Sequence, residues 1–293
     1  MLTEKQRLEL KQMMDQKLKS FGQVPSEEME KYPVNREERE IPVSNGTSRV
    51  IFFSSGEENA NRPLFLNFHG GGFIGKHMDR DERFCRELAY TFHGLVLDVD
   101  YCLAPANPYP AAVNECWELV QWVWNHLDEL KVCPDKILLV GHSSGGNLAA
   151  GLCMRLGESG LFRPAALVMD YPPLDLFTDP EEKPASICDM PPERARDYNK
   201  KYIAPEQSKE PYASPLFAPE EMLEYFPDTL IISAGEDRLS REDEEFGLRL
   251  ARAGVAVTMK RFTASVHGFV INQMCEWEEA MELIRIFVKN HIE

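Results

Sequence analysis

The sequence has neither an excess of basic charge nor a long apolar run. Its 293 residues contain 32 Lys and Arg against 48 Asp and Glu, which gives a formal net charge of −16. Nucleic acid and anionic membranes bind through basic patches, so this balance argues against both partners. No stretch approaches the roughly 18 apolar residues of a membrane-spanning helix, and residues 1–20 lack the pattern of an export signal. We therefore expect a cytoplasmic protein that does not insert into a membrane.

The cysteines show no pattern that would hold a metal or a disulfide framework. They are odd in number, scattered, and without C-x-x-C spacing: Cys85, Cys102, Cys116, Cys133, Cys153, Cys188 and Cys275. Structural zinc sites and disulfide scaffolds need paired or clustered cysteines. We expect reduced thiols and no metal site.

What the chain does contain is a regular alternation of apolar strand patterns and helical patterns. At 43% hydrophobic residues it can bury one large core, which favours a single α/β domain over residues 1–293 with an insertion. Strands are predicted at 40–43, 49–53, 63–68, 95–100, before Gly141, and at 165–169, 229–234 and 255–259. Helices are predicted at 3–18, 79–92, 112–127, after Ser143, and at 242–253 and 273–289. Such alternation predicts a mainly parallel sheet covered by helices on both faces, with a connector at 24–40 and an irregular excursion at 171–219.

The stretch from Lys136 to Ala150 reads as a buried strand that turns sharply into a helix at Ser143. Gly141 and Gly145 frame this serine as G-x-S-x-G, because a Cβ at either position would collide in so tight a turn. The turn would hold the Ser143 hydroxyl away from the sheet as a nucleophile. The N–H of Ser144, at the start of the helix, would face an oxygen that becomes negative during attack. The alternative is an ordinary glycine-rich turn before a helix.

A run of three glycines follows the predicted strand at 63–68 directly, in His69-Gly70-Gly71-Gly72-Phe73. Glycines are kept where backbone must come close to another group. We interpret the run as an oxyanion hole in which the N–H groups of Gly71 and Gly72 approach a substrate carbonyl. A flexible surface turn is the alternative, but it does not explain the position at the end of an apolar strand.

A serine nucleophile needs a base, and a carboxylate must orient that base. His267 is the best placed of the seven histidines, because it falls in a loop between the last strand and the final helix. Asp237 follows the strand at 229–234, at the edge of the sheet where sites in α/β proteins lie. Glu236 and Asp243 are rivals for the acid. The order Ser143, Asp237, His267 is that of an α/β-hydrolase.

Five segments resemble, in order, the marks of the hormone-sensitive-lipase-like family of α/β-hydrolase esterases, over Leu64 to the C-terminus. These are His69 to Phe73, Asp100 to Pro105, the Ser143 turn, Tyr212 to Leu216, and His267 to Phe269. The resemblance implies that Ser143, Asp237 and His267 are catalytic and that Gly71, Gly72 and Ser144 form the oxyanion hole. It also implies a small helical cap made from residues 1–40 and an insertion at 174–210.

The chain departs from the family pattern at three positions. His142 and Ser144 flank the serine where Asp and Ala are more usual, and Arg238 follows Asp237 where Pro is usual. Because only the backbone N–H of Ser144 would serve the oxyanion hole, its side chain should not disable the site. These differences concern substrate preference more than mechanism.

The function predicted from these patterns is hydrolysis of short-chain carboxylic esters, acetyl to butyryl, through an acyl-enzyme and without a metal or organic cofactor. The expected partner is a small ester substrate, and the oligomeric state is open, with a homodimer as one option. Two alternatives share the fold. One is a ligand-binding protein without turnover, and the other is a peptidase or amidase with the same triad.

Overall fold

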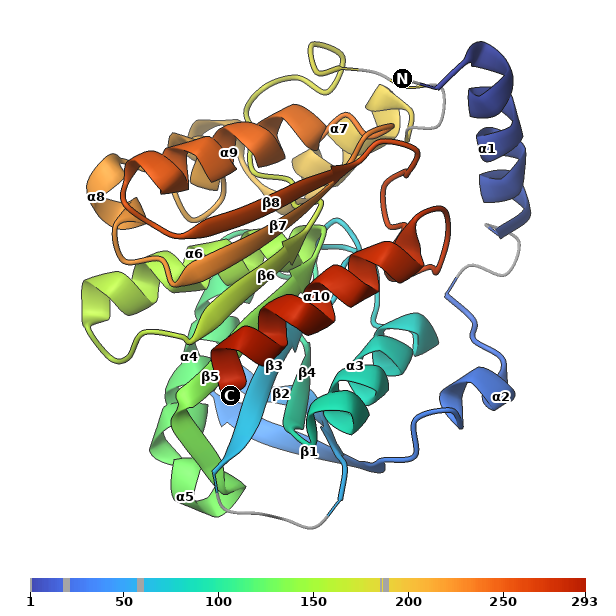
Figure 1. Cartoon of the computed structure of the whole chain (residues 1–293). Helices are drawn as coiled ribbons and strands as arrows, with labels where there is room; N and C mark the ends of the chain where they lie inside the picture. Colours follow the sequence, from blue (N-terminus) through green and yellow to red (C-terminus); the bar gives the residue numbers. More distant parts are fainter. Residues whose placement is uncertain (1, 18–21, 57–60, 185, 187–189) are drawn as a thin grey trace.

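The computed structural model describes residues 2–17, 22–56, 61–184, 186 and 190–293, so Leu18 at the end of the first predicted helix and Cys188 lie outside it. Its centre is one sheet of eight strands in the order β1-β2-β4-β3-β5-β6-β7-β8 (Figure 1). The strands are β1 (Asn35–Val43), β2 (Gly46–Ser54), β3 (Arg62–Phe68), β4 (Leu95–Asp100), β5 (Val132–His142), β6 (Ala166–Asp170), β7 (Asp228–Ala234) and β8 (Val257–Phe262).

The sheet is mainly parallel, as predicted. Strands β1 and β2 form an antiparallel hairpin, and β2 also pairs antiparallel with β4. From β4 to β8 every neighbouring pair is parallel. The carboxyl ends of these parallel strands meet at one edge of the sheet, and the loops that follow them come together there.

Helices cover both faces of the sheet (Figure 1). They are α1 (Glu4–Lys17), α2 (Ser26–Met29), α3 (Asp79–Phe92), α4 (Ala111–Asn125), α5 (Leu127–Leu130), α6 (Ser144–Ser159), α7 (Pro192–Tyr202), α8 (Glu220–Leu223), α9 (Ser240–Arg252) and α10 (Trp277–Ile292). Helices α4, α6 and α9 pack on one face and α3 and α10 on the other. Alternate strand residues divide between the two cores, Leu66 facing one and Phe65 the other, because the side chains of a strand alternate. In the described part of the chain, no helix combines the length and apolarity needed to cross a membrane.

The two outer strands differ most from the prediction. Strand β1 begins at Asn35, inside the expected connector, and α2 occupies another part of that connector. The first half of β1 is polar because it lies at the edge of the sheet, where charged side chains are common. Strand β8, the opposite edge, is shifted to 257–262 and carries Lys260 and Arg261. A search for apolar alternation misses strands of this kind.

Candidate active site

Ser143 lies at the sharp turn from β5 into α6. Its φ of 51° places a non-glycine residue in the left-handed region, which is a strained backbone conformation. A Cβ on Gly141 would overlap the backbone of Gly145, and a Cβ on Gly145 would overlap the backbone of Phe68 at the end of β3. The steric reason predicted for these two glycines is therefore confirmed. The Ser143 N–H donates to the Asp170 carbonyl at 2.9 Å, which joins the turn to β6.

The imidazole of His267 connects the Ser143 hydroxyl to the Asp237 carboxylate. His267 lies in the loop between β8 and α10, with Nε2 2.9 Å from Ser143 Oγ and Nδ1 2.7 Å from Asp237 Oδ2. Asp237 is 2% exposed, whereas His267 is 31% exposed. The Asp237 carboxylate is thus shielded from water, whereas part of the His267 imidazole is accessible to it. The structure brings together all three residues that the sequence singled out.

Backbone hydrogen bonds connect the loop that carries Asp237 to the loop that carries His267 and so set the distance between them. The N–H of Glu236 donates to the Ser265 carbonyl at 2.9 Å, and the N–H of Gly235 donates to the Phe262 carbonyl at 2.8 Å. The second oxygen of Asp237 accepts from the N–H of Leu239 at 3.1 Å. The carboxylate is therefore fixed from both sides, which restricts how it can turn relative to the imidazole.

Among the described residues, neither Glu236 nor Asp243, the two rivals for the acid, forms a hydrogen bond with His267. Asp243 is buried within α9, where burial, with a contribution from the charge of Asp237, raises the pKa of its carboxyl far above the ordinary range. Glu236 accepts hydrogen bonds from Arg7 of α1. The geometry favours Asp237 as the partner of the imidazole.

The glycine loop leaves β3 and folds back on itself next to Ser143. Gly71 (φ 138°) and Gly72 (φ 61°) have positive φ values that other residues rarely adopt. The Gly71 carbonyl accepts from the N–H groups of Ile74 at 3.2 Å and Gly75 at 2.8 Å, which closes the turn. Within the described ranges, no group accepts a hydrogen bond from the N–H of Gly71, Gly72 or Ser144. These three donors remain available to a ligand.

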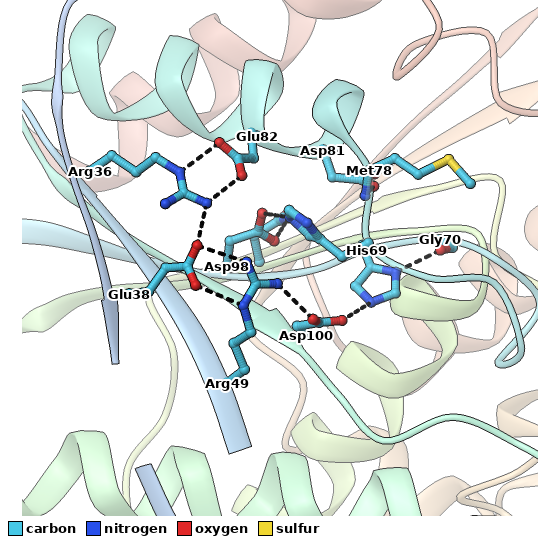
Figure 2. Close-up of polar contacts among 12 residues, drawn as sticks. Arg36, Glu38, Arg49, His69, Gly70, Met78, Asp81, Glu82, Asp98 and Asp100 are labelled. Atoms are coloured by element: carbon cyan, nitrogen blue, oxygen red, sulfur yellow. Dashed lines mark hydrogen bonds and ion pairs between the residues drawn. The ribbon is translucent and has the colours of Figure 1, made fainter. Parts of the chain in front are cut away.

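His69 anchors the start of this loop in a buried polar network (Figure 2). Its Nδ1 donates to the Gly70 carbonyl at 2.7 Å, its Nε2 lies 3.7 Å from Asp100, and its ring stacks on Tyr101. The Tyr101 hydroxyl donates to the His69 carbonyl at 2.8 Å. Burial alone would raise the pKa of Asp100, but the nearby His69 imidazole and the hydrogen bond from Arg49 lower it to about 2. Asp100 therefore stays ionised and attracts His69 at the start of the glycine loop.

The network continues from Asp100 to the edge of the sheet. Arg49 of β2 bridges Asp100 and Glu38, each at 2.8 Å, and Arg36 of β1 bridges Glu38 and Glu82 of α3, each at 2.7 Å (Figure 2). Alternating charges thus connect three strands and a helix behind the glycine loop. Within the described residues, no group of three or more His, Cys, Asp or Glu side chains is arranged to hold a metal ion.

Sequence reasoning missed Tyr171 and noted Arg238 only as a departure from the family pattern, yet both shape the site. The ring of Tyr171 lies 5.0 Å from that of His267, and the guanidinium of Arg238 donates to the carbonyls of Pro180 and Met190. Tyr171 follows β6 directly, so the rule that sites form at the carboxyl ends of parallel strands could have found it. Arg238 connects the acid loop to the insertion, which explains structurally why an arginine replaces the usual proline.

A parallel sheet whose strand ends carry a serine at a strand-to-helix turn, an acid loop and a histidine loop has the arrangement of a serine hydrolase of the α/β type. The chain belongs to the family described as alpha/beta hydrolase fold, whose profile matches residues 65–271. This confirms the predicted fold and the resemblance to hormone-sensitive-lipase-like esterases.

Three relatives illustrate the similarity. The chain is 30% identical to the esterase LipI of Mycobacterium tuberculosis, over 76% of this chain and 70% of the relative. It is 29% identical to an arylesterase of Saccharolobus solfataricus, over 89% and 84%. The solved structure of a hyperthermophilic esterase from Pyrobaculum calidifontis superposes with a TM-score of 0.81 at 28% identity, covering 97% of this chain and 92% of that one.

Proposed function

We propose that this protein is a serine carboxylesterase that hydrolyses short-chain acyl esters through an acyl-enzyme on Ser143. The observation that carries the proposal is the unbroken hydrogen-bond chain from Asp237 through His267 to Ser143, next to three N–H groups that no described residue accepts from and that can bind an oxyanion. Relatives named esterase and arylesterase, similar over most of both chains, support the same reaction class.

In the first step, Ser143 Oγ attacks the ester carbonyl carbon while His267 Nε2 takes the hydroxyl proton. The 2.9 Å separation of these atoms lies within the range for proton transfer. Asp237 holds the imidazole with Nε2 directed at the serine and stabilises the imidazolium that forms. The imidazolium then gives its proton to the departing alcohol, and the acyl group remains on Ser143.

The negative oxygen of the tetrahedral intermediate would accept hydrogen bonds from the N–H groups of Gly71, Gly72 and Ser144. Donors fixed in place before the reaction stabilise this charge without reorganisation, and loss of one such donor slows turnover by about 10²–10³-fold. In the second half-reaction, water replaces the alcohol, His267 again acts as base, and the carboxylic acid leaves. Every step uses protein groups and water, so the proposal requires no cofactor.

A preference for short acyl chains is supported by the contact between α7 and the glycine loop. A Cβ on Gly72 would overlap the ring of Tyr198, so this ring lies directly against the loop. Four residues further on, Tyr202 stacks on Phe73 with ring centroids 3.7 Å apart. We propose that α7, in the insertion at 174–210, covers the site as part of a small cap and limits the space for long acyl chains.

Hydrolysis of p-nitrophenyl esters from acetate to palmitate, with Ser143→Ala beside the wild type, tests the function. We expect kcat/KM to fall beyond butyrate, and Ser143→Ala to lose on the order of 10⁵-fold in kcat. Ser159→Ala, at the far end of α6, makes the same substitution away from the site and should match the wild type. If Ser143→Ala kept most of the activity, the assignment of the nucleophile would be wrong.

The two alternatives predict different results in the same assay. Stoichiometric binding of an ester without turnover would indicate a ligand-binding protein, and equal rates on p-nitroanilides and p-nitrophenyl esters would indicate an amidase.

The limit on acyl-chain length is tested at Tyr198. Tyr198→Ala should extend activity toward octanoate, whereas Tyr198→Phe should leave the chain-length profile unchanged. An unchanged profile in Tyr198→Ala would remove this residue from the argument.

A further inference from the structure

Helix α1 carries three side chains on one face that reach the two loops holding Asp237 and His267. Arg7, Leu10 and Met14 are spaced three and four residues apart, so they project from the same side of the helix. Leu8, on another side, is 54% exposed. The helix therefore has a defined inner face, although it makes no part of the sheet or of the two layers that cover it.

The polar contact of this face is with the acid loop. Arg7 Nε lies 3.0 and 2.9 Å from the two carboxylate oxygens of Glu236, the residue immediately before Asp237. The Glu236 side chain is only 4% exposed, and a carboxylate withdrawn from water needs a cation or several donors. Ser186, in the insertion, donates a further hydrogen bond to it. Glu236 thus joins α1 and the insertion to the loop of the proposed catalytic acid.

The apolar contact of the same face is with the base loop. Leu10 and Met14 pack against Val266 and Met274, both of which are buried. Val266 immediately precedes His267. Figure 1 shows α1 outside the layered body of the fold, beside the loop that connects β8 to α10. One short helix therefore touches the residue before the acid and the residue before the base.

We propose that α1 is a strap that holds together the loop of Asp237 (the acid loop) and the loop of His267 (the base loop). In this proposal Glu236 is a positioning residue, because Arg7 of α1 binds its carboxylate. The two loops already contact each other where the Glu236 N–H donates to the Ser265 carbonyl. Helix α1 adds a second connection between them on the outer side. The inference rests on the proposed function, because positioning matters only if Asp237 and His267 act together. A misplacement of about 1 Å in such a site can lower turnover by about 10²-fold.

Three changes test the strap against two matched controls. Arg7→Gln and Glu236→Gln remove one partner each, and Arg7→Lys keeps the positive charge. Lys5→Gln breaks the exposed Lys5–Glu9 pair on the same helix, and Leu8→Ser changes an exposed apolar side chain. Each variant is examined as the full chain by backbone hydrogen exchange of residues 2–17 and by kcat and KM on p-nitrophenyl butyrate at 0.02 and 0.5 M NaCl.

We expect Arg7→Gln and Glu236→Gln to exchange at least tenfold faster in α1 and to lose about fivefold to tenfold in kcat with little change in KM. The double variant should lose no more than either single one, because both remove the same contact. Arg7→Lys should recover most of the rate. Salt should lower kcat in the wild type but not in Arg7→Gln, because the partly exposed ion pair is screened.

Two results would overturn the strap. One is unchanged exchange in α1 when Arg7 or Glu236 is replaced. The other is faster exchange with unchanged kcat, which would make α1 a cover that does not position the triad. If the wild type and both controls hydrolysed no ester, the proposed function would fail, and the exchange data would still report whether Arg7 holds α1.

Discussion

Nδ1 of His142 lies 2.7 Å from Oδ2 of Asp170, and both side chains are buried. The two residues are partners across β5 and β6, immediately before Ser143 and Tyr171. Family members more often have an aspartate before the serine. In this chain an aspartate at that position would face Asp170, so the departure at His142 has a structural reason.

His142→Asp should therefore destabilise the protein. It places a second carboxylate beside Asp170 in the core, and an uncompensated buried charge costs about 3–5 kcal/mol. We expect Tm to fall by roughly 10 °C in a chain of this size. Adding Asp170→Asn removes the repulsion and should restore most of the loss. Calorimetry of the single and double variants checks this, and a His142→Asp protein as stable as the wild type would contradict it.

Asp237→Asn should lower kcat by about 10³–10⁴-fold with the fold intact, because an amide in this place favours the wrong tautomer of His267. Asp243→Asn is the matched control. Burial raises the pKa of the Asp243 carboxyl, which favours its neutral form, and asparagine has nearly the shape of that form. It should change kcat by less than about tenfold. Equal losses in the two variants would return Asp243 to the list of candidate acids.

Two glycines of α6 should respond oppositely to the same substitution. A Cβ on Gly145 would overlap the backbone of Phe68 and His69, which cannot move without displacing β3. Gly151 lies within the helix, and its nearest neighbour to a new Cβ is the Tyr212 carbonyl oxygen at 3.4 Å, an ordinary contact. Gly145→Ala should prevent folding or lower Tm sharply. Gly151→Ala should raise stability by about 0.5–1 kcal/mol, and thermal melts of both variants decide the matter.

The sequence predicted that Ser143, Asp237 and His267 would come together because two general constraints act on them. Catalysis needs these residue types, and parallel strands bring the loops at their carboxyl ends to one edge. Helix α3 and strand β4 were predicted with the residues they have in the structure, since clear helical or apolar patterns define them.

The contacts of Glu236 and Arg238 could not be predicted in this way. They depend on where α1 and the insertion dock, and no periodicity in the sequence specifies a docking position. The first half of β1 has the charged pattern of a connector, because its edge position allows charged residues on both faces. Tyr202 is buried in a stack with Phe73, and no local pattern specifies a pairing that joins segments about 130 residues apart.

The buried pair of His77 and Asp98 should make stability depend on pH above neutrality. His77 Nε2 lies 2.6 Å from Asp98 Oδ2, and the Asn67 amide donates to the other oxygen at 2.8 Å. Burial alone would lower the pKa of His77, but the charge and hydrogen bond of Asp98, with smaller contributions from Asp81 and Asp100, raise it to about 9.

Because the pKa of His77 is higher in the folded than in the unfolded chain, its protonated form stabilises the fold. This contribution is complete below about pH 6.5, the ordinary value, and is lost as the pH rises through about 9. It amounts to on the order of 3 kcal/mol. Urea unfolding at pH 6, 7.5 and 9.5 should show a difference between wild type and His77→Asn that shrinks as the pH rises. His93→Asn, at the exposed C-cap of α3, should show no such trend. A difference that stays constant from pH 6 to 9.5 would mean that His77 is neutral in the folded protein.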